Sequence, residues 1–215
     1  MATAGLQVGG FTQMTTIDYP DHLAAVVFCQ GCPLRCHYCH NPELLRRRTD
    51  EPLAWSEILD FLAARRGLLD AVVFSGGEPT LQRSLMQAVI EVKALGYLIG
   101  LHTAGIYPGR LQQLLPLVDW VGLDIKALAQ DYPRLTGVPH GGESAWRSAR
   151  LLAASGVPHE IRTTLYPAID NDDYRNRLRR ELATLGELTH RWQPCRESPG
   201  NKPDHDRSKN QISFY

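Results

Sequence analysis

The sequence predicts an α/β protein in which buried strands alternate with amphipathic helices. Two observations predict this class. Short runs rich in valine, isoleucine and leucine recur along the chain, as buried parallel strands require. Longer segments with apolar residues on one face separate these runs, which is the pattern of repeated βα units. Parallel strands of this kind form an open doubly wound sheet or a partly closed barrel, and both place their sites at the carboxyl ends of the strands.

The order of the predicted elements is β(αβ)5. The strands are expected at residues 24–29, 71–75, 97–103, 120–125, 159–165 and, with a weaker pattern, 188–193. The helices are expected at residues 56–66, 82–95, 109–117, 144–155 and 172–185. Ser56 is expected to cap the first helix, and Gly67, Gly96 and Gly156 are expected to end three of the helices.

Length and composition indicate one folded domain without a charge-driven partner. The chain has 215 residues, of which 43% are hydrophobic and 21% charged. Its 23 lysines and arginines balance 23 aspartates and glutamates, so no global field attracts nucleic acid or an acidic membrane. The amino-terminal segment lacks a leader pattern and no apolar run spans a bilayer, so we expect a cytoplasmic protein. Residues 1–193 are predicted to form the domain, and the polar residues 194–215 a flexible tail.

Four of the five cysteines fall within eleven positions, from Cys29 to Cys39. In a reducing compartment such crowding favours metal binding over a disulfide framework. Cys32, Cys36 and Cys39 have C-x3-C-x2-C spacing and follow the first predicted strand. Three thiolates can bind three irons of a cubane cluster and leave the fourth iron open for a substrate.

Other interpretations of these cysteines stay open at this point. Cys29-x2-Cys32 resembles a redox pair, all four thiols could form a compact zinc site, and residues 36–40 match C-x-x-C-H haem attachment. Haem attachment normally accompanies export, and structural zinc sites usually separate their cysteine pairs by a dozen or more residues. The haem and zinc interpretations are therefore weaker than the interpretation as a cubane iron–sulfur cluster.

Two motifs resemble those of the radical S-adenosylmethionine (SAM) superfamily. The first is the C-x3-C-x2-C spacing with an aromatic residue, Tyr38, before the last cysteine. The second is Ser-Gly-Gly-Glu-Pro at residues 75–79, after the second strand, which resembles the GGE motif that binds the amino group of the methionine moiety. The resemblance implies a partial (βα)6 TIM-like barrel of parallel strands with its active site at the carboxyl ends of the strands. It also implies one [4Fe-4S] cluster on Cys32, Cys36 and Cys39, and SAM bound by Tyr38, Gly76, Gly77, Glu78, Thr103, Asp124, Lys126 and Arg162.

Three of these residues carry charge and have an alternative, structural interpretation. Asp124 and Lys126 are two apart on a strand, so they project to the same face, which we expect to be the barrel interior. They could equally form a structural ion pair. The resemblance implies that Arg162 binds the carboxylate of the cofactor, a contact that suits a planar guanidinium, although an ordinary salt bridge is nearly as plausible.

A narrower resemblance covers nearly all of residues 8–193. Residues 17–20, 23–28, 31–44 and 132–137 are similar to those of anaerobic ribonucleoside-triphosphate reductase activating proteins, which are glycyl-radical-enzyme activases. The resemblance implies that the chain cleaves SAM reductively to a 5′-deoxyadenosyl radical, which takes a hydrogen from a glycine of a partner. That partner would be the anaerobic reductase, and a flavodoxin- or ferredoxin-like protein would supply the electron. Cys29 departs from the threonine expected in relatives, and the sequence after residue 193 lacks a sixth helix. We expect Cys29 and Cys195 to be ordinary thiols.

Two other classes of function remain. A compact radical SAM enzyme that acts on a small molecule, such as 7-carboxy-7-deazaguanine synthase, would have the same cluster motif. A non-catalytic iron–sulfur or zinc module would need only the cysteines.

Overall fold

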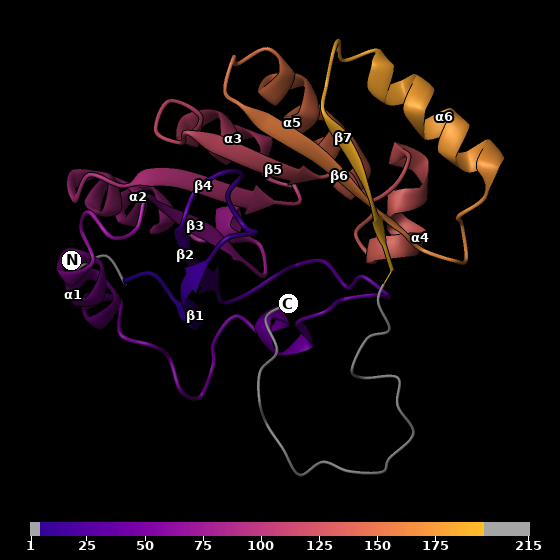
Figure 1. Cartoon of the computed structure of the whole chain (residues 1–215). Helices are drawn as coiled ribbons and strands as arrows, with labels where there is room; N and C mark the ends of the chain where they lie inside the picture. The colour runs from indigo at the N-terminus through magenta and orange to yellow at the C-terminus, as the bar shows by residue number, and fades with distance from the viewer. Residues whose placement is uncertain (1–4, 196–215) are drawn as a thin grey trace.

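Seven strands form one sheet in the computed structural model, which describes residues 5–195 (Figure 1). They lie in the sheet in the same order as in the chain. The first is antiparallel to the second, and every later pair is parallel. The strands are β1 (Val8–Thr15), β2 (Ala24–Cys29), β3 (Ala71–Gly76), β4 (Leu98–Thr103), β5 (Trp120–Asp124), β6 (His159–Leu165) and β7 (His190–Pro194).

The helices cover the outer side of the curved sheet (Figure 1). They are α1 (Trp55–Ala64), α2 (Leu85–Ala94), α3 (Pro108–Leu114), α4 (Tyr132–Thr136), α5 (Gly141–Ala153) and α6 (Asp172–Ala183). Three short 3₁₀ helices, η1 (Pro42–Leu45), η2 (Pro79–Leu81) and η3 (Ala129–Asp131), lie in the loops after β2, β3 and β5. No helix within residues 5–195 is long and apolar enough to cross a membrane.

The strand order decides between the two architectures that the sequence allows. A doubly wound sheet reverses its strand order at a switch point. Strands β2 to β7 follow one another without such a reversal, and right-handed connections then place the helices on one side of the sheet. In the described part of the chain β1 and β7 each have one neighbouring strand, so the barrel stays open. The predicted partial barrel is therefore confirmed.

Alternate residues of the strands face two apolar clusters. Val27, Phe74 and Leu123 belong to the larger cluster, which fills the space between the sheet and the helices. Val26 and Val73 point the other way, into a smaller cluster inside the barrel. The inner cluster ends below the carboxyl ends of the strands, where the inward-facing side chains become polar.

The predicted elements are present, with differences at their ends. The sixth strand is displaced by one or two residues, and Gly96 and Gly156 follow α2 and α5 with φ angles of +93° and +74°. Ser56 was wrongly expected to cap a helix: Ala54 is the residue before α1 and no side chain caps it. Helix α2 begins at Leu85 rather than at residue 82, because the Gln82 side chain donates to the carbonyl oxygens of Gln7 and Gln30 and is held in the preceding loop.

Strand β1 and helix α4 have no counterpart among the predicted elements. Two glycines and several polar residues interrupt the alternation in β1, and the strand is irregular in its pairing with β2. Helix α4 has five residues, too few for a helical period to show. At the other end, Pro194 closes β7, so the predicted tail boundary at residue 194 falls within the last strand, and residues 196–215 of that tail lie outside the described residues.

Candidate active site

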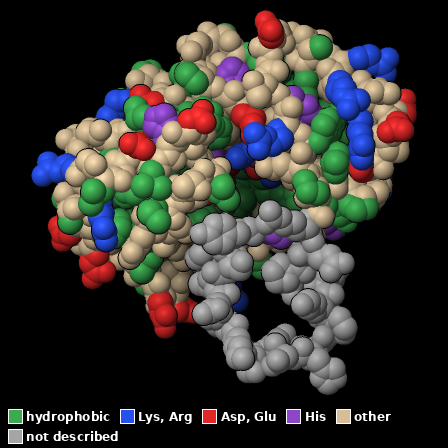
Figure 2. All heavy atoms as spheres, viewed as in Figure 1, with side chains coloured by type: hydrophobic (Ala, Val, Ile, Leu, Met, Phe, Trp, Pro, Cys, Tyr) green, Lys and Arg blue, Asp and Glu red, His purple; other side chains and the backbone are tan. Residues whose placement is uncertain are grey.

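A cavity of about 440 Å³ opens at the carboxyl ends of the parallel strands. Figure 2 shows the corresponding hollow between the two sides of the molecule, with hydrophobic and basic side chains visible in it. The residues that line it come from the ends of β3 to β7 and from the loops that follow β2, β3, β4 and β5. They are Cys32, Leu34, Cys36, Tyr38, Cys39, His40, Asn41, Leu45, Ser75, Gly76, Gly77, His102, Thr103, Ala104, Asp124, Lys126, Arg162, Thr164, Gln193 and Pro194.

The structure brings together all of the predicted site residues except Glu78 around this cavity. Among the further lining residues, Thr164 and Gln193 were not singled out in the sequence, whereas Ser75 belongs to the predicted motif at residues 75–79 and His102 precedes the predicted Thr103. Each of these four residues lies at an inward-facing position near the end of its strand. This position can be recognised only when the pairing register of the strands is known. Serine, threonine and glutamine are too common at strand ends to be selected without that register.

The loop that carries the cysteines is held between η1 and α4. The backbone N–H groups of Gly31 and Cys32 donate to the carbonyl oxygens of Leu44 and Leu45, at 2.9 and 3.4 Å. The backbone N–H of Arg35 donates to the Thr136 carbonyl oxygen at 2.7 Å, and its guanidinium donates to the Cys32 carbonyl oxygen, also at 2.7 Å. The loop is therefore fixed by its own backbone, and its thiols are left to face the cavity.

The three thiols of the C-x3-C-x2-C motif are partly buried. Burial raises the pKa of Cys32 to about 12 and also raises the pKa values of Cys36 and Cys39. Cys29 lies fully buried in the helix-side core, facing away from the cavity, and burial raises its pKa as well. Within residues 5–195, no three histidine, cysteine or acidic side chains lie close enough together to bind a single metal ion.

Gly76, the last residue of β3, lies against β2, and Gly77, which follows it, lies against the cysteine loop. The N–H of Gly77 donates to the Cys29 carbonyl oxygen, and the N–H of Glu78 donates to that of Gly31, both at 2.9 Å. A Cβ atom on Gly76 would lie 2.6 Å from the Cys29 nitrogen, and one on Gly77 would overlap the Gly31 carbonyl oxygen. A larger residue at position 76 would separate β3 from β2, and one at position 77 would separate the two loops.

Glu78 lies behind the cavity wall and not on its surface. Its carboxylate is fully buried and accepts hydrogen bonds from the Thr80 backbone at 3.0 Å, the Thr103 hydroxyl at 2.7 Å and the Ala104 backbone at 2.8 Å. Burial raises its pKa, although these hydrogen bonds act in the opposite direction. The side chain thus joins the loops after β3 and β4 and fixes Thr103. Its predicted contact with a cofactor stays a prediction.

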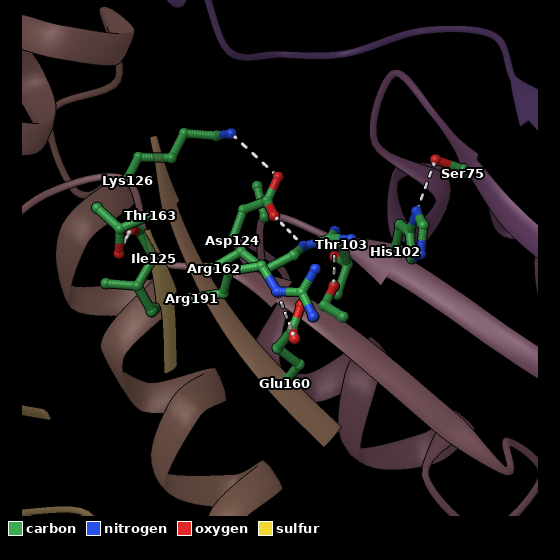
Figure 3. Close-up of polar contacts among 12 residues, drawn as sticks. Ser75, His102, Thr103, Asp124, Ile125, Lys126, Glu160, Arg162, Thr163 and Arg191 are labelled. Carbon is green, nitrogen blue, oxygen red and sulfur yellow. Dashed lines mark hydrogen bonds and ion pairs between the residues drawn. The ribbon is translucent and has the colours of Figure 1, made fainter. Parts of the chain in front are cut away.

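Three charged side chains meet on the opposite wall (Figure 3). One Asp124 carboxylate oxygen is 2.9 Å from Arg162 Nε, and the other is 3.4 Å from Lys126 Nζ. Burial opposes ionisation of Asp124, but the two cations outweigh it and lower the pKa of the carboxyl. Burial likewise lowers the pKa of Lys126, but the negative charge of Asp124 outweighs this effect, so the pKa of Lys126 is raised. The predicted common face of Asp124 and Lys126 is confirmed, and the group carries one net positive charge.

Neighbouring residues hold these side chains in place. Gly122 leaves room for the guanidinium, because a Cβ there would lie 2.9 Å from Arg162 Cζ. The backbone N–H of Lys126 donates to the Tyr132 hydroxyl at 2.9 Å, and its ammonium lies 5.9 Å from the centre of the Tyr38 ring. The Tyr38 hydroxyl is buried at the cavity and makes no hydrogen bond within the described residues, although Thr164 lies near enough to lower its pKa against the raising effect of burial.

Comparison with known proteins gives the class of this chain. Residues 26–180 match the profile of the Radical SAM superfamily. A Methanocaldococcus jannaschii protein named for glycyl-radical enzyme activation is 34% identical over 180 residues, covering 77% of this chain and 71% of that protein. The pyruvate formate-lyase-activating enzyme of Clostridium pasteurianum is 32% identical over 169 residues, covering 76% and 70%.

Solved structures share the fold. SuiB of Streptococcus suis, bound to S-adenosylmethionine, has a TM-score of 0.64 at 17% identity, covering 82% of this chain and 42% of its own. The structure of anSMEcpe with bound AdoMet has a TM-score of 0.61 at 19% identity, covering 78% and 49%. The chain thus spans less than half of either structure.

The chain belongs to the radical SAM superfamily. Within the superfamily it is a member of the glycyl-radical-enzyme activating enzymes, which are oxidoreductases. The superfamily uses a [4Fe-4S] cluster with three cysteine ligands together with SAM. The donor set fits this cluster, because three thiols of one loop face one cavity while Cys29, at the end of β2, faces the core.

Proposed function

We propose that this chain cleaves SAM reductively in the cavity at the strand ends and thereby generates a glycyl radical on a partner enzyme. The observation that carries this proposal is the placement of three thiols and a positively charged group around one cavity. A carboxylate and an amino group, the two ends of the methionine moiety, can be bound there by different walls.

The thiols of Cys32, Cys36 and Cys39 would hold the cluster. When bound, the cluster supplies one electron, which splits SAM into methionine and a 5′-deoxyadenosyl radical. Lys126 and Arg162 are placed to bind the carboxylate, since Asp124 neutralises only one of the two cations. Gly76 and Gly77 line the cavity, and a backbone carbonyl group there can accept a hydrogen bond from an amino group. Leu34, Ala104 and Ile106 form an apolar cluster against the cysteine loop, which limits water near the reacting atoms.

Pyruvate formate-lyase is the first partner to test. Relatives that are 31–32% identical are named pyruvate formate-lyase-activating enzymes, which favours this partner for the present chain. The motif resemblance of residues 17–44 and 132–137 favours the anaerobic ribonucleoside-triphosphate reductase as the second. A flavodoxin- or ferredoxin-like protein is the proposed electron donor.

One experiment distinguishes these functions. Anaerobically reconstituted protein is reduced and incubated with SAM and with each partner in turn, and electron paramagnetic resonance is used to detect a glycyl doublet. A doublet with one partner and not with the other identifies the substrate. SAM cleavage without a doublet from either partner would contradict both assignments and favour the small-molecule alternative. Stoichiometric zinc in place of iron would contradict the function as a whole.

A further inference from the structure

The cysteine loop forms a thin wall between the cavity and solvent. Its three ligand cysteines line the cavity. Arg35 and His37, which stand on either side of Cys36 in the sequence, are exposed and do not line the cavity. In the described part of the chain, a cluster held by these thiols is therefore separated from solvent by little more than the loop itself.

This thin wall is the open route for an electron. The proposed reaction consumes one electron for each SAM that is cleaved. SAM and the glycine loop of the partner enzyme share the cavity, so a protein that delivers the electron is left with the outer side of the cysteine loop. Electron transfer weakens steeply with distance, and the redox group of such a protein must therefore come close to that side.

A run of three arginines lies against the cysteine loop on its η1 side. Residues 46–48 follow η1, and all three side chains are exposed. The side-chain amide of Gln30 donates to the Arg46 carbonyl oxygen at 2.7 Å. A Cβ atom on Gly31 would lie 3.4 Å from Arg47 Cα, so the backbones of the two segments touch. The run thus contacts the residue that precedes the first ligand cysteine.

Two more arginines flank the loop on its α4 side. The Arg35 guanidinium donates to the carbonyl oxygens of Cys32 and Leu34, at 2.7 and 2.8 Å. Arg134, in α4, lies beside the loop, because its carbonyl oxygen is 3.2 Å from His37 Nε2. Both arginine side chains are exposed. The carbonyl partners of Arg35 carry no net charge, so its own charge is not neutralised.

The charge of these five arginines is not cancelled locally. None of them forms an ion pair within residues 5–195, whereas Lys93, Arg175 and Arg191 each pair with a carboxylate. The acidic residues nearest to them in the sequence are Glu43 and residues 50–51, which are exposed. Five positive charges thus stand against three negative ones, in a chain whose formal net charge is zero.

We propose that this basic surface, formed by Arg35, Arg46, Arg47, Arg48 and Arg134, is the docking site of the electron donor, a small carrier protein with an acidic surface around its redox group. This inference rests on the proposed function. The reduced carrier loses one electron and the cluster gains it, and no atom is transferred. Complementary charge increases association rates by about 10- to 1,000-fold at low salt. Electron-transfer complexes are small and transient, so a few exposed charges around the loop suffice.

The test is stopped-flow reduction of the cluster-loaded, SAM-bound protein by fully reduced flavodoxin, an acidic carrier. At about 0.1 M salt, where the field of a charge extends about 10 Å, we expect Arg46→Gln/Arg47→Gln/Arg48→Gln to lower the second-order rate constant at least about tenfold. Added salt should slow the wild type and change the variant little, so that their rates converge. Arg46→Lys/Arg47→Lys/Arg48→Lys retains the charge and should restore most of the rate.

Two controls isolate the docking surface. Arg177→Gln/Arg179→Gln/Arg180→Gln removes the same charge from the exposed face of α6 and should keep the rate within about twofold of the wild type. Photoreduced 5-deazariboflavin, a small uncharged reductant, should reduce the wild type and every variant equally and support equal SAM cleavage. Thermal unfolding verifies that each variant is folded.

Several results would overturn the inference. They are a wild type that flavodoxin does not reduce, an unchanged rate in the glutamine variant of residues 46–48, or an equal loss in the α6 variant. A loss with deazariboflavin as well would place the effect at the cluster, and normal reduction with a lower yield of glycyl radical would assign the surface to the partner enzyme. The proposed function is judged separately, by SAM cleavage in the wild type with deazariboflavin. Absence of that cleavage would overturn the proposed function.

Discussion

At the scale of single residues, Gly77 decides whether two loops of the site can meet. Gly77→Ala should destabilise the fold by about 1–3 kcal/mol and reduce iron incorporation, because its Cβ would overlap a backbone oxygen that has no flexible side chain to move. Chemical denaturation and iron analysis measure the two effects. Gly109→Ala is the matched control, since nothing lies within 4 Å of a Cβ there, and it should be neutral or stabilising by up to about 1 kcal/mol. Equal behaviour of the two variants would contradict this account.

The four clustered cysteines differ in the direction that they face, and this predicts different roles. Cys32→Ala, Cys36→Ala and Cys39→Ala should each lose the cluster, measured as iron content and visible absorbance after anaerobic reconstitution. Cys29→Ala should retain about four irons per chain and lose about 1 kcal/mol of stability, because its sulfur fills only core volume. Loss of iron in Cys29→Ala with retention in any of the other three would assign the ligands differently.

His102 also predicts how stability depends on pH. Its pKa in the folded protein, about 3, is below the value of about 6.5 for an unfolded histidine. The unfolded state therefore binds the proton more readily. The stability associated with the neutral ring is present above pH 6.5 and is lost as the pH falls from there toward 3, by up to about 1.4 kcal/mol per pH unit. Urea unfolding of wild type and His102→Asn should converge as the pH falls through this window; parallel curves would refute the shift.

At the scale of secondary-structure elements, α4 joins the cysteine loop to the end of β5. Tyr132→Phe removes the acceptor of the buried Lys126 N–H, which should cost about 1–3 kcal/mol and weaken binding of SAM. Tyr174→Phe provides the control, since the Tyr174 hydroxyl also accepts from a backbone N–H, that of Leu128 at 3.0 Å, but Leu128, unlike Lys126, does not line the cavity. Chemical denaturation should show similar losses of stability in both variants. Calorimetry should show weaker binding of SAM only in Tyr132→Phe. Unchanged binding in both variants would show that α4 is only structural.

Hydrophobic periodicity predicts the parallel strands of this chain because they are buried on both faces. The same signal fails for β1, where glycines break the alternation, and for α4, which is shorter than two helical turns. The cysteines, Asp124 and Lys126 are recognisable because their spacing carries chemistry. Thr164 and Gln193 are different: a polar residue at a strand end gains a role only from the register that brings it to the inner face. Glu78 is the opposite case: the sequence shows the motif to which it belongs, but not that its side chain is buried behind the cavity wall.

At the scale of the whole molecule, the cofactor and a protein substrate need different parts of the cavity, and the barrel has an open side between β1 and β7. The sheet ends at β7 in the described part of the chain, and β7 contributes Gln193 to the cavity wall. Most other lining residues belong to the opposite side and to the cysteine loop. A glycine loop of a partner must enter this cavity, and the edge strand contributes to its wall.

A large side chain on the inner face of β7 should therefore uncouple the two steps. In Gln193→Trp we expect the yield of glycyl radical on the partner to fall at least about tenfold, because the indole occupies the space that the glycine loop needs. Binding of SAM should change less, since Gln193 lies on the edge strand, two residues beyond the position that pairs with Arg162. Electron paramagnetic resonance measures the first quantity and calorimetry the second. Glu187→Trp adds the same ring at an exposed position before β7 and should leave both unchanged. Parallel losses of radical yield and SAM affinity in Gln193→Trp would mean that the edge strand serves the cofactor, and that a protein substrate enters from another side.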